Sequence, residues 1–256
     1  MFMGYCKISL NICQEENYEE KIVLILCFII LSGCGEHKNI AYDVKTQLTK
    51  TADMAEIPAS NMDKKYYSYY LPAGIVRKES TDVNEVFRVD QNDLVMNFNT
   101  ANIVINKFYK ESPKVVDTKS EASKKAEIKD LQKVTYKKGK NGEYIYKGYY
   151  ENNHYQTYPY SLVLIKNKNN DYLMHLNATI VDFYSVLPSA SISSSLKIMM
   201  KLAKSIEYKS EVVLNDYSMK QIENSKKENL DFLTKNFPEE GYLNEVENKR
   251  EESPIK

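Results

Sequence analysis

Hydrophobic and polar residues alternate along much of the middle of the chain, a pattern typical of strands with one buried face. The clearest case runs from residue 86 to residue 98, where the polar run 90–93 separates two apolar stretches and predicts a hairpin. Residues 103–109 are expected to form a third strand, with a short helix as the alternative. Further strands are expected where aromatic and β-branched residues are concentrated: 143–151, 155–166 and 172–184.

The pattern changes to a helical period after Pro188. Apolar residues repeat there at spacings of four and three and share one face of a helix over 191–206: Ile192, Leu196, Met199, Ala203 and Ile206. Strands followed by one amphipathic helix predict an α+β fold, an antiparallel sheet with a C-terminal amphipathic helix packed on one face. The Tyr70-Leu71-Pro72 segment that opens this region and the helix that closes it are similar in architecture to the PsbP/Mog1-type α/β sandwich.

A short apolar run near the N-terminus, residues 22–31, contains no charged residue. Its length suits the hydrophobic region of a signal peptide, because a membrane-spanning helix needs roughly 18 or more apolar residues. The tetrad Leu31-Ser32-Gly33-Cys34 that ends it resembles the lipobox of bacterial lipoproteins. The resemblance implies cleavage before Cys34, a diacylglyceryl group on its sulfur, and an anchor at the extracytoplasmic face of the cell membrane.

Acidic residues in the first 20 positions depart from this pattern, since signal peptides begin with basic residues. Either the signal peptide at 1–33 is atypical, or the true start of translation lies after residues 1–20. All four cysteines lie at or before the expected cleavage site: Cys6, Cys13, Cys27 and Cys34. The mature chain is therefore expected to have no disulfide, no catalytic thiol and no cysteine metal site.

Composition divides the rest of the chain into three parts. Residues 34–63 are polar and are expected to form a tether, with room for one short helical patch, between the lipid anchor and a globular α+β domain at 64–217. Residues 218–256 are expected to begin as a polar helix and to end as a disordered acidic tail.

Charge and motifs exclude several classes of function. The 256 residues include 35 basic and 35 acidic side chains, and a net charge of zero argues against a general nucleic-acid-binding protein. The sequence contains no Gly-x-Ser-x-Gly motif, no phosphate-binding loop, no dinucleotide fingerprint and no histidine spacing typical of a metal site. We therefore expect a protein that is not an enzyme and that uses no cofactor and no metal.

Tyrosine is unusually frequent, with 21 residues in all, and many of them fall between residues 136 and 160. Exposed tyrosines contact sugars and proteins well, because the ring is rigid and amphipathic. The alternative is that they are ordinary strand residues. The candidate binding surface, in which Tyr149 and Tyr158 are expected to face outward, consists of Tyr144, Tyr146, Tyr149, Tyr158 and Tyr160.

Together these features predict a lipid-anchored extracytoplasmic lipoprotein with a binding or assembly role at the cell envelope. Its expected partners are the membrane, reached through the diacylglyceryl group on Cys34, and an envelope protein or a wall glycan. Nucleic acid is not an expected partner. Two alternatives remain open: an envelope hydrolase, in which Asp171 or Asp182 would meet His175, and a substrate-binding lipoprotein of a transporter.

Overall fold

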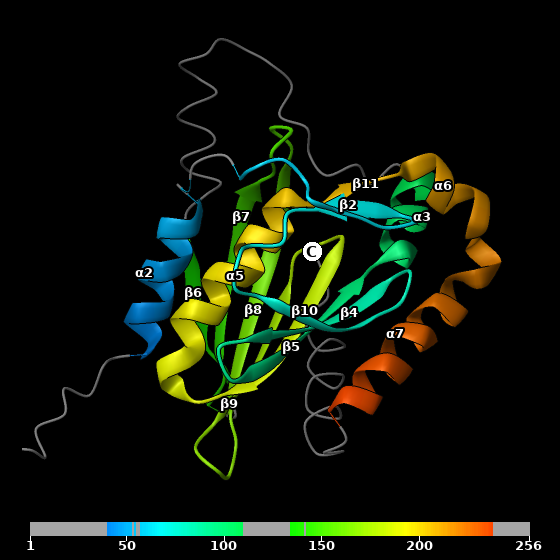
Figure 1. Ribbon diagram of the computed structural model, residues 1–256. Coiled ribbons are helices and arrows are strands. Elements are labelled where there is room, and N and C mark those ends of the chain that lie inside the picture. The colour runs from blue at the N-terminus through cyan, green and yellow to red at the C-terminus, as the bar shows by residue number, and fades with distance from the viewer. Residues whose placement is uncertain (1–39, 53, 55–56, 110–133, 141, 238–256) are drawn as a thin grey trace, which may run out of the picture. The chain divides into compact units, whose positions relative to one another are not determined.

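The computed structural model describes residues 40–52, 54, 57–109, 134–140 and 142–237. Their largest element is an antiparallel sheet of eight strands (Figure 1). The strands are β3 (Val76–Ser80), β4 (Asn84–Val89), β5 (Asn92–Phe98), β6 (Thr135–Lys138), β7 (Tyr144–Glu151), β8 (Thr157–Lys166), β9 (Tyr172–Asn177) and β10 (Val181–Leu187). They are hydrogen-bonded in the order β3-β4-β5-β10-β9-β8-β7-β6. The predicted signal peptide, the lipobox with Cys34 and the acidic tail beyond residue 237 lie outside the described residues.

Tight turns join most of the neighbouring strands. The hairpin predicted over 86–98 is confirmed, since β4 and β5 pair from Asn84 opposite Asn97 to Val89 opposite Asn92. Asp90 begins its two-residue turn with a φ of 53°, the left-handed conformation that such hairpins require. The stretch 172–184, predicted as one strand, is divided into β9 and β10 by a turn in which Thr179 has a φ of 66°.

The third strand predicted at 103–109 is wrong, because these residues belong to helix α3 (Thr100–Tyr109). Ala101 and Val104 lie one helical turn apart and are both buried. The side chain of Asn99 accepts a hydrogen bond from the Asn102 N–H at 3.4 Å, which is the N-cap pattern of a helix start. The β-branched run favoured a strand, but the helical alternative is the one that buries an apolar face.

Two helices cover one face of the sheet. Helix α5 (Ile192–Ser205) confirms the helix predicted at 191–206, and its Leu196 is fully buried. Helix α2 (Ile40–Ala52) packs beside α5 and buries Val44 and Leu48 in the same core. The tether predicted at 34–63 is therefore wrong from Ile40 onward, because two apolar residues in a polar stretch are enough to dock a helix.

A second, smaller sheet lies against the same core. It has the strand order β1 (Met62–Asp63), β2 (Tyr67–Tyr69) and β11 (Glu207–Tyr208). The fully buried carboxylate of Glu85 on β4 joins the two sheets by accepting hydrogen bonds from the hydroxyls of Tyr67, at 3.3 Å, and Tyr69, at 2.5 Å. Burial, and then the negative charge of Glu85, raise the pKa of the Tyr67 hydroxyl, so that it stays protonated and can donate.

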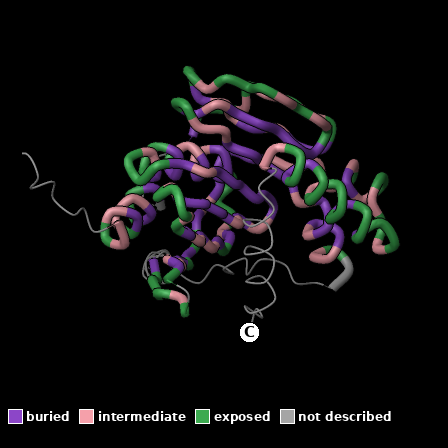
Figure 2. The backbone as a smooth tube through the Cα atoms, turned by 90° about the horizontal axis from the view of Figure 1, so that it is seen from below, coloured by how far each residue is buried: buried purple, intermediate pink, exposed green. Residues whose placement is uncertain are grey.

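The opposite face of the sheet is covered in part by helix α7 (Ile222–Asn236), which follows the short helices α6 (Ser210–Asp216) and η2 (Met219–Gln221). Phe232 and Leu233 of α7 pack on Val86 and Val95 of the sheet. The polar helix predicted after residue 217 is thus part of the packed domain. Many buried residues lie in the inner strands, whereas the edge strands β3 and β6, the turns and the outer helix faces are largely exposed (Figure 2). The fold is α+β, as predicted.

Candidate ligand-binding groove

The five tyrosines predicted to form a binding surface do not lie on one exposed surface. Tyr146, Tyr158 and Tyr160 are buried in the core beneath the helices, and Tyr144 is half-buried on the same side of β7. Only Tyr149 is exposed, and the alternation of the strand places it on the other face. The prediction that Tyr158 faces outward is wrong, because the strand period shows which residues share a face but not which face is covered.

The buried tyrosines are fixed by their surroundings. Three of their hydroxyls donate to oxygen atoms of the chain: Tyr146 to Ala41 O at 3.3 Å, Tyr150 to Ala178 O at 3.0 Å, and Tyr158 to Gln156 Oε1 at 2.8 Å. The ring of Tyr160 lies so close to β7 that a Cβ atom at Gly148 would be 2.6 Å from its hydroxyl oxygen. These contacts make the tyrosines structural residues of the core.

The structure brings together one pair that the hydrolase alternative requires. His175 Nε2 lies 3.1 Å from Asp182 Oδ1, and both side chains are almost completely buried. Asp182 also accepts a hydrogen bond from Asn177 at 2.7 Å, and the His175 ring stacks on Tyr184 with 4.3 Å between ring centroids. A histidine held by an aspartate must reach a nucleophile, a metal, a water or the substrate to be catalytic, and the side chain of His175 is only 8% exposed. These contacts make His175 a hydrogen-bonded residue of the sheet, whereas Asp171 lies in the turn before β9.

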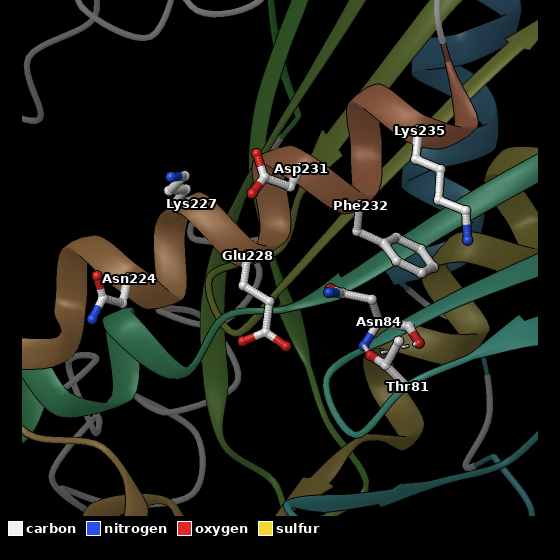
Figure 3. A pocket seen from close by; sticks show the side chains of 8 residues that line it. All are labelled: Thr81, Asn84, Asn224, Lys227, Glu228, Asp231, Phe232 and Lys235. Carbon is white, nitrogen blue, oxygen red and sulfur yellow. Dashed lines mark hydrogen bonds between the residues drawn. The ribbon is translucent and has the colours of Figure 1, made fainter.

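A groove with a volume of about 440 Å³ lies between helix α7 and the turn that joins β3 to β4 (Figure 3). We call it the α7 groove. Its size falls within the usual range of small-molecule sites, roughly 300–1,000 Å³. The lining residues are Thr81, Asn84, Asn224, Lys227, Glu228, Asp231, Phe232 and Lys235.

Hydrogen bonds fix both walls of the α7 groove. On the strand side, Thr81 Oγ1 accepts a hydrogen bond from the Asn84 N–H at 2.9 Å, and the Thr81 N–H donates to Asn84 O at 2.8 Å. On the helix side, Asn97 Nδ2 donates to Asn229 O at 3.2 Å, and the hydroxyls of Thr100 and Ser225 are hydrogen-bonded. The side chains that line the groove are therefore carried by a rigid frame.

Asn84 forms the floor of the α7 groove and is only 1% exposed. Neither its Oδ1 nor its Nδ2 has a hydrogen-bond partner among the described residues. Its amide points from β4 toward α7, between the side chains of Glu228 and Phe232 (Figure 3). A buried polar group without a partner destabilises a fold by about 1–3 kcal/mol, so a partner supplied from outside would be favourable here.

Two lysines and two acidic residues line the groove, and the charged side chain next to Asn84 is that of Glu228 (Figure 3). Partial burial, and then the nearby carboxylate of Asp82, raise the pKa of the Glu228 carboxyl above its ordinary value. Glu228 has no ion pair within the described part of the chain, whereas Lys235 is paired with Glu79 at 2.5 Å. Lys227 points away from Asn84 on the outer side of the helix (Figure 3). The charge nearest the floor of the groove is therefore an uncompensated carboxylate.

Sequence reasoning did not find this site. Asn84 follows a Thr-Asp-Val turn and resembles any polar residue at the start of a strand, and Glu228 is one of many charges on a polar helix. No local signal connects two residues that are so far apart in the chain. The only available cue was an asparagine at a position where the alternation of β4 expects a buried side chain.

Two further observations on the described residues concern metal binding and membrane spanning. No group of three or more His, Cys, Asp and Glu side chains lies close enough there to hold a metal ion. No helix in the same ranges is both long and apolar enough to cross a membrane.

Comparisons with family models, curated proteins and solved structures gave no match to this chain. The resemblances to the lipobox and to the PsbP/Mog1 sandwich therefore stay predictions.

Proposed function

We propose that this chain is a lipoprotein, anchored by a diacylglyceryl group on Cys34 at the extracytoplasmic face of the cell membrane, that binds a ligand in its α7 groove. In this role it recognises a component of the cell envelope and does not catalyse a reaction.

The proposal of a lipid anchor is supported by the order of features along residues 22–34. An uncharged apolar run ends in Leu31-Ser32-Gly33-Cys34, and the chain becomes polar directly afterwards. Small residues at 32 and 33 allow an extended backbone to enter a signal peptidase, and the thiol of Cys34 is the atom that can carry the lipid. Two acyl chains on one cysteine hold a protein stably on a membrane, whereas a single chain binds only marginally.

The proposal of a binding role rests on one observation, the buried amide of Asn84 without a partner. Buried polar groups in folded proteins are almost always hydrogen-bonded, and exceptions call for an explanation. The orphaned amide lies in a groove of ligand size and points into it (Figure 3). A ligand that pairs with this amide accounts for both facts.

The lipid anchor is tested by replacing its cysteine. The Cys34→Ala variant, expressed in a bacterium fed with a fatty-acid analogue, should carry no label and should accumulate as an unprocessed precursor. Cys27→Ala is the matched control, because Cys27 lies within the apolar run and should not affect labelling. Label that persists on Cys34→Ala would overturn the assignment.

A further inference from the structure

The α7 groove also indicates what kind of ligand it takes, an inference that rests on the proposal that this groove is the binding site. We propose that the groove binds a peptide unit whose side chain ends in a primary ammonium group, as in a lysine residue. Three properties of the groove lead to this class: the orphaned amide, the unpaired carboxylate on one side of it, and the apolar wall on its other side.

The amide of Asn84 selects a partner that both donates and accepts. Its Nδ2 needs an acceptor and its Oδ1 needs a donor, and both atoms are unpartnered within the described residues. In an extended peptide the N–H and the C=O of one residue point to the same side, so one residue of the ligand can satisfy both atoms. Ligands with acceptors alone, such as simple carboxylates or phosphates, would leave Oδ1 unpaired.

The charge of the groove selects a cation. The carboxylate of Glu228 lies beside the Asn84 amide and has no ion pair in the described part of the chain. Asp82 adds a second negative charge nearby. The one lysine that reaches toward the strand side, Lys235, is already paired with Glu79. An ammonium group would therefore compensate Glu228 through a charge-assisted hydrogen bond, whereas an anion would be repelled.

Phe232 supplies the remaining contact. Its ring is 8% exposed and forms the wall of the groove next to Asn84 (Figure 3). Carbon atoms of the ligand can pack on such an apolar surface while its charged end stays at the polar rim. The backbone of the ligand would thus meet Asn84 and Phe232, and its ammonium group would meet Glu228 on the opposite side of Asn84.

The test uses the full chain in detergent micelles, with Nα-acetyl-lysine N-methylamide as the probe and isothermal titration calorimetry as the measurement. Saturable binding is expected with a Kd of about 1 mM, the affinity usual for a ligand of this size. Two analogues each lack one recognised group: Nα-acetyl-norleucine N-methylamide has no ammonium, and butylamine has no amide. Each should bind about tenfold more weakly than the probe.

Variants locate the binding in the groove. Glu228→Gln should weaken binding of the lysine probe about tenfold and leave the norleucine analogue unaffected. Glu223→Gln is the matched control, because Glu223 lies on the same helix, is highly exposed and is not part of the groove. The proposal is overturned if the wild type shows no saturable binding, if norleucine binds as well as lysine, or if Glu228→Gln binds like the wild type.

The outcome is independent of the lipid anchor. A chain that carries lipid on Cys34 but does not bind the probe would overturn the ligand class and leave the anchor standing. A chain that binds the probe but carries no lipid would overturn the anchor and leave the ligand class standing.

Discussion

Asn84 and Asn97 face each other across strands β4 and β5, but only Asn97 is hydrogen-bonded to helix α7, through Nδ2 and the carbonyl oxygen of Asn229. The two side chains lie on the same face of the sheet and are both almost completely buried. The difference is that the side chain of Asn97 is hydrogen-bonded to the backbone of the helix, whereas Asn84 lines the α7 groove. One asparagine therefore holds the helix in place, and the amide of the other has no hydrogen-bond partner among the described residues.

This difference predicts opposite effects on stability. Asn84→Leu removes an unpaired buried amide and should leave the free energy of unfolding unchanged or raise it. Asn97→Leu leaves Asn229 O without its partner and should lower the free energy by about 1–3 kcal/mol. Urea unfolding followed by circular dichroism compares the two variants. A larger loss for Asn84→Leu than for Asn97→Leu would mean that Asn84 is a structural residue.

The tyrosines of β7 and β8 provide a second prediction. Tyr158→Ala should lower the free energy of unfolding by about 3–5 kcal/mol, because it opens a cavity in the core. Tyr149→Ala serves as the control, since its exposed ring can be removed with a change within about 0.5 kcal/mol. Equal effects of the two substitutions, measured by the same urea titration, would contradict the burial of Tyr158.

Helices α2 and α5 should contribute to the same core. Leu48→Ala in α2 and Leu196→Ala in α5 each remove a fully buried side chain and should cost about 2–5 kcal/mol of unfolding free energy. Lys45→Ala, at an exposed position of α2, is the matched control. If Leu48→Ala changed stability no more than Lys45→Ala, α2 would be part of a tether and not of the domain.

Asp93 gives stability a defined dependence on pH. Partial burial alone would raise the pKa of this carboxyl, but the bonds from Lys78 at 2.6 Å and Arg88 at 2.7 Å outweigh it and lower the pKa. Because the folded pKa is below the unfolded value of about 4, ionised Asp93 stabilises the fold above that pH. The contribution is lost as the pH falls through the folded pKa.

The Asp93→Asn variant should therefore have a lower melting temperature than the wild type near neutral pH, and the difference should vanish in acid. The site is partly exposed and screened by solvent, so the loss should be less than about 1 kcal/mol. Melting curves recorded across the acid range check this. A difference between variant and wild type that does not change with pH would contradict the role of the charge.

The elements that could be predicted from the sequence are those with a long, unambiguous period. The hairpin of β4 and β5 and the helix around Leu196 belong to this group. For α3 the helix was only the alternative, and the docking of α2 on the core was missed, because the buried faces of both helices are short. The burial of Tyr158 was missed because alternation alone does not identify the covered face. The α7 groove depends on two distant segments that come together only in the folded chain.

The most direct test of the account is the nuclear magnetic resonance signal of the Asn84 side-chain amide. In the full chain labelled with ¹⁵N-asparagine, the Asn84→Leu variant identifies this signal by its absence. The account predicts that the signal shifts progressively and saturably as Nα-acetyl-lysine N-methylamide is added, because the amide acquires its missing partner. An Asn84 signal that stays unchanged throughout the titration would contradict the proposal that this groove is a binding site for such a ligand.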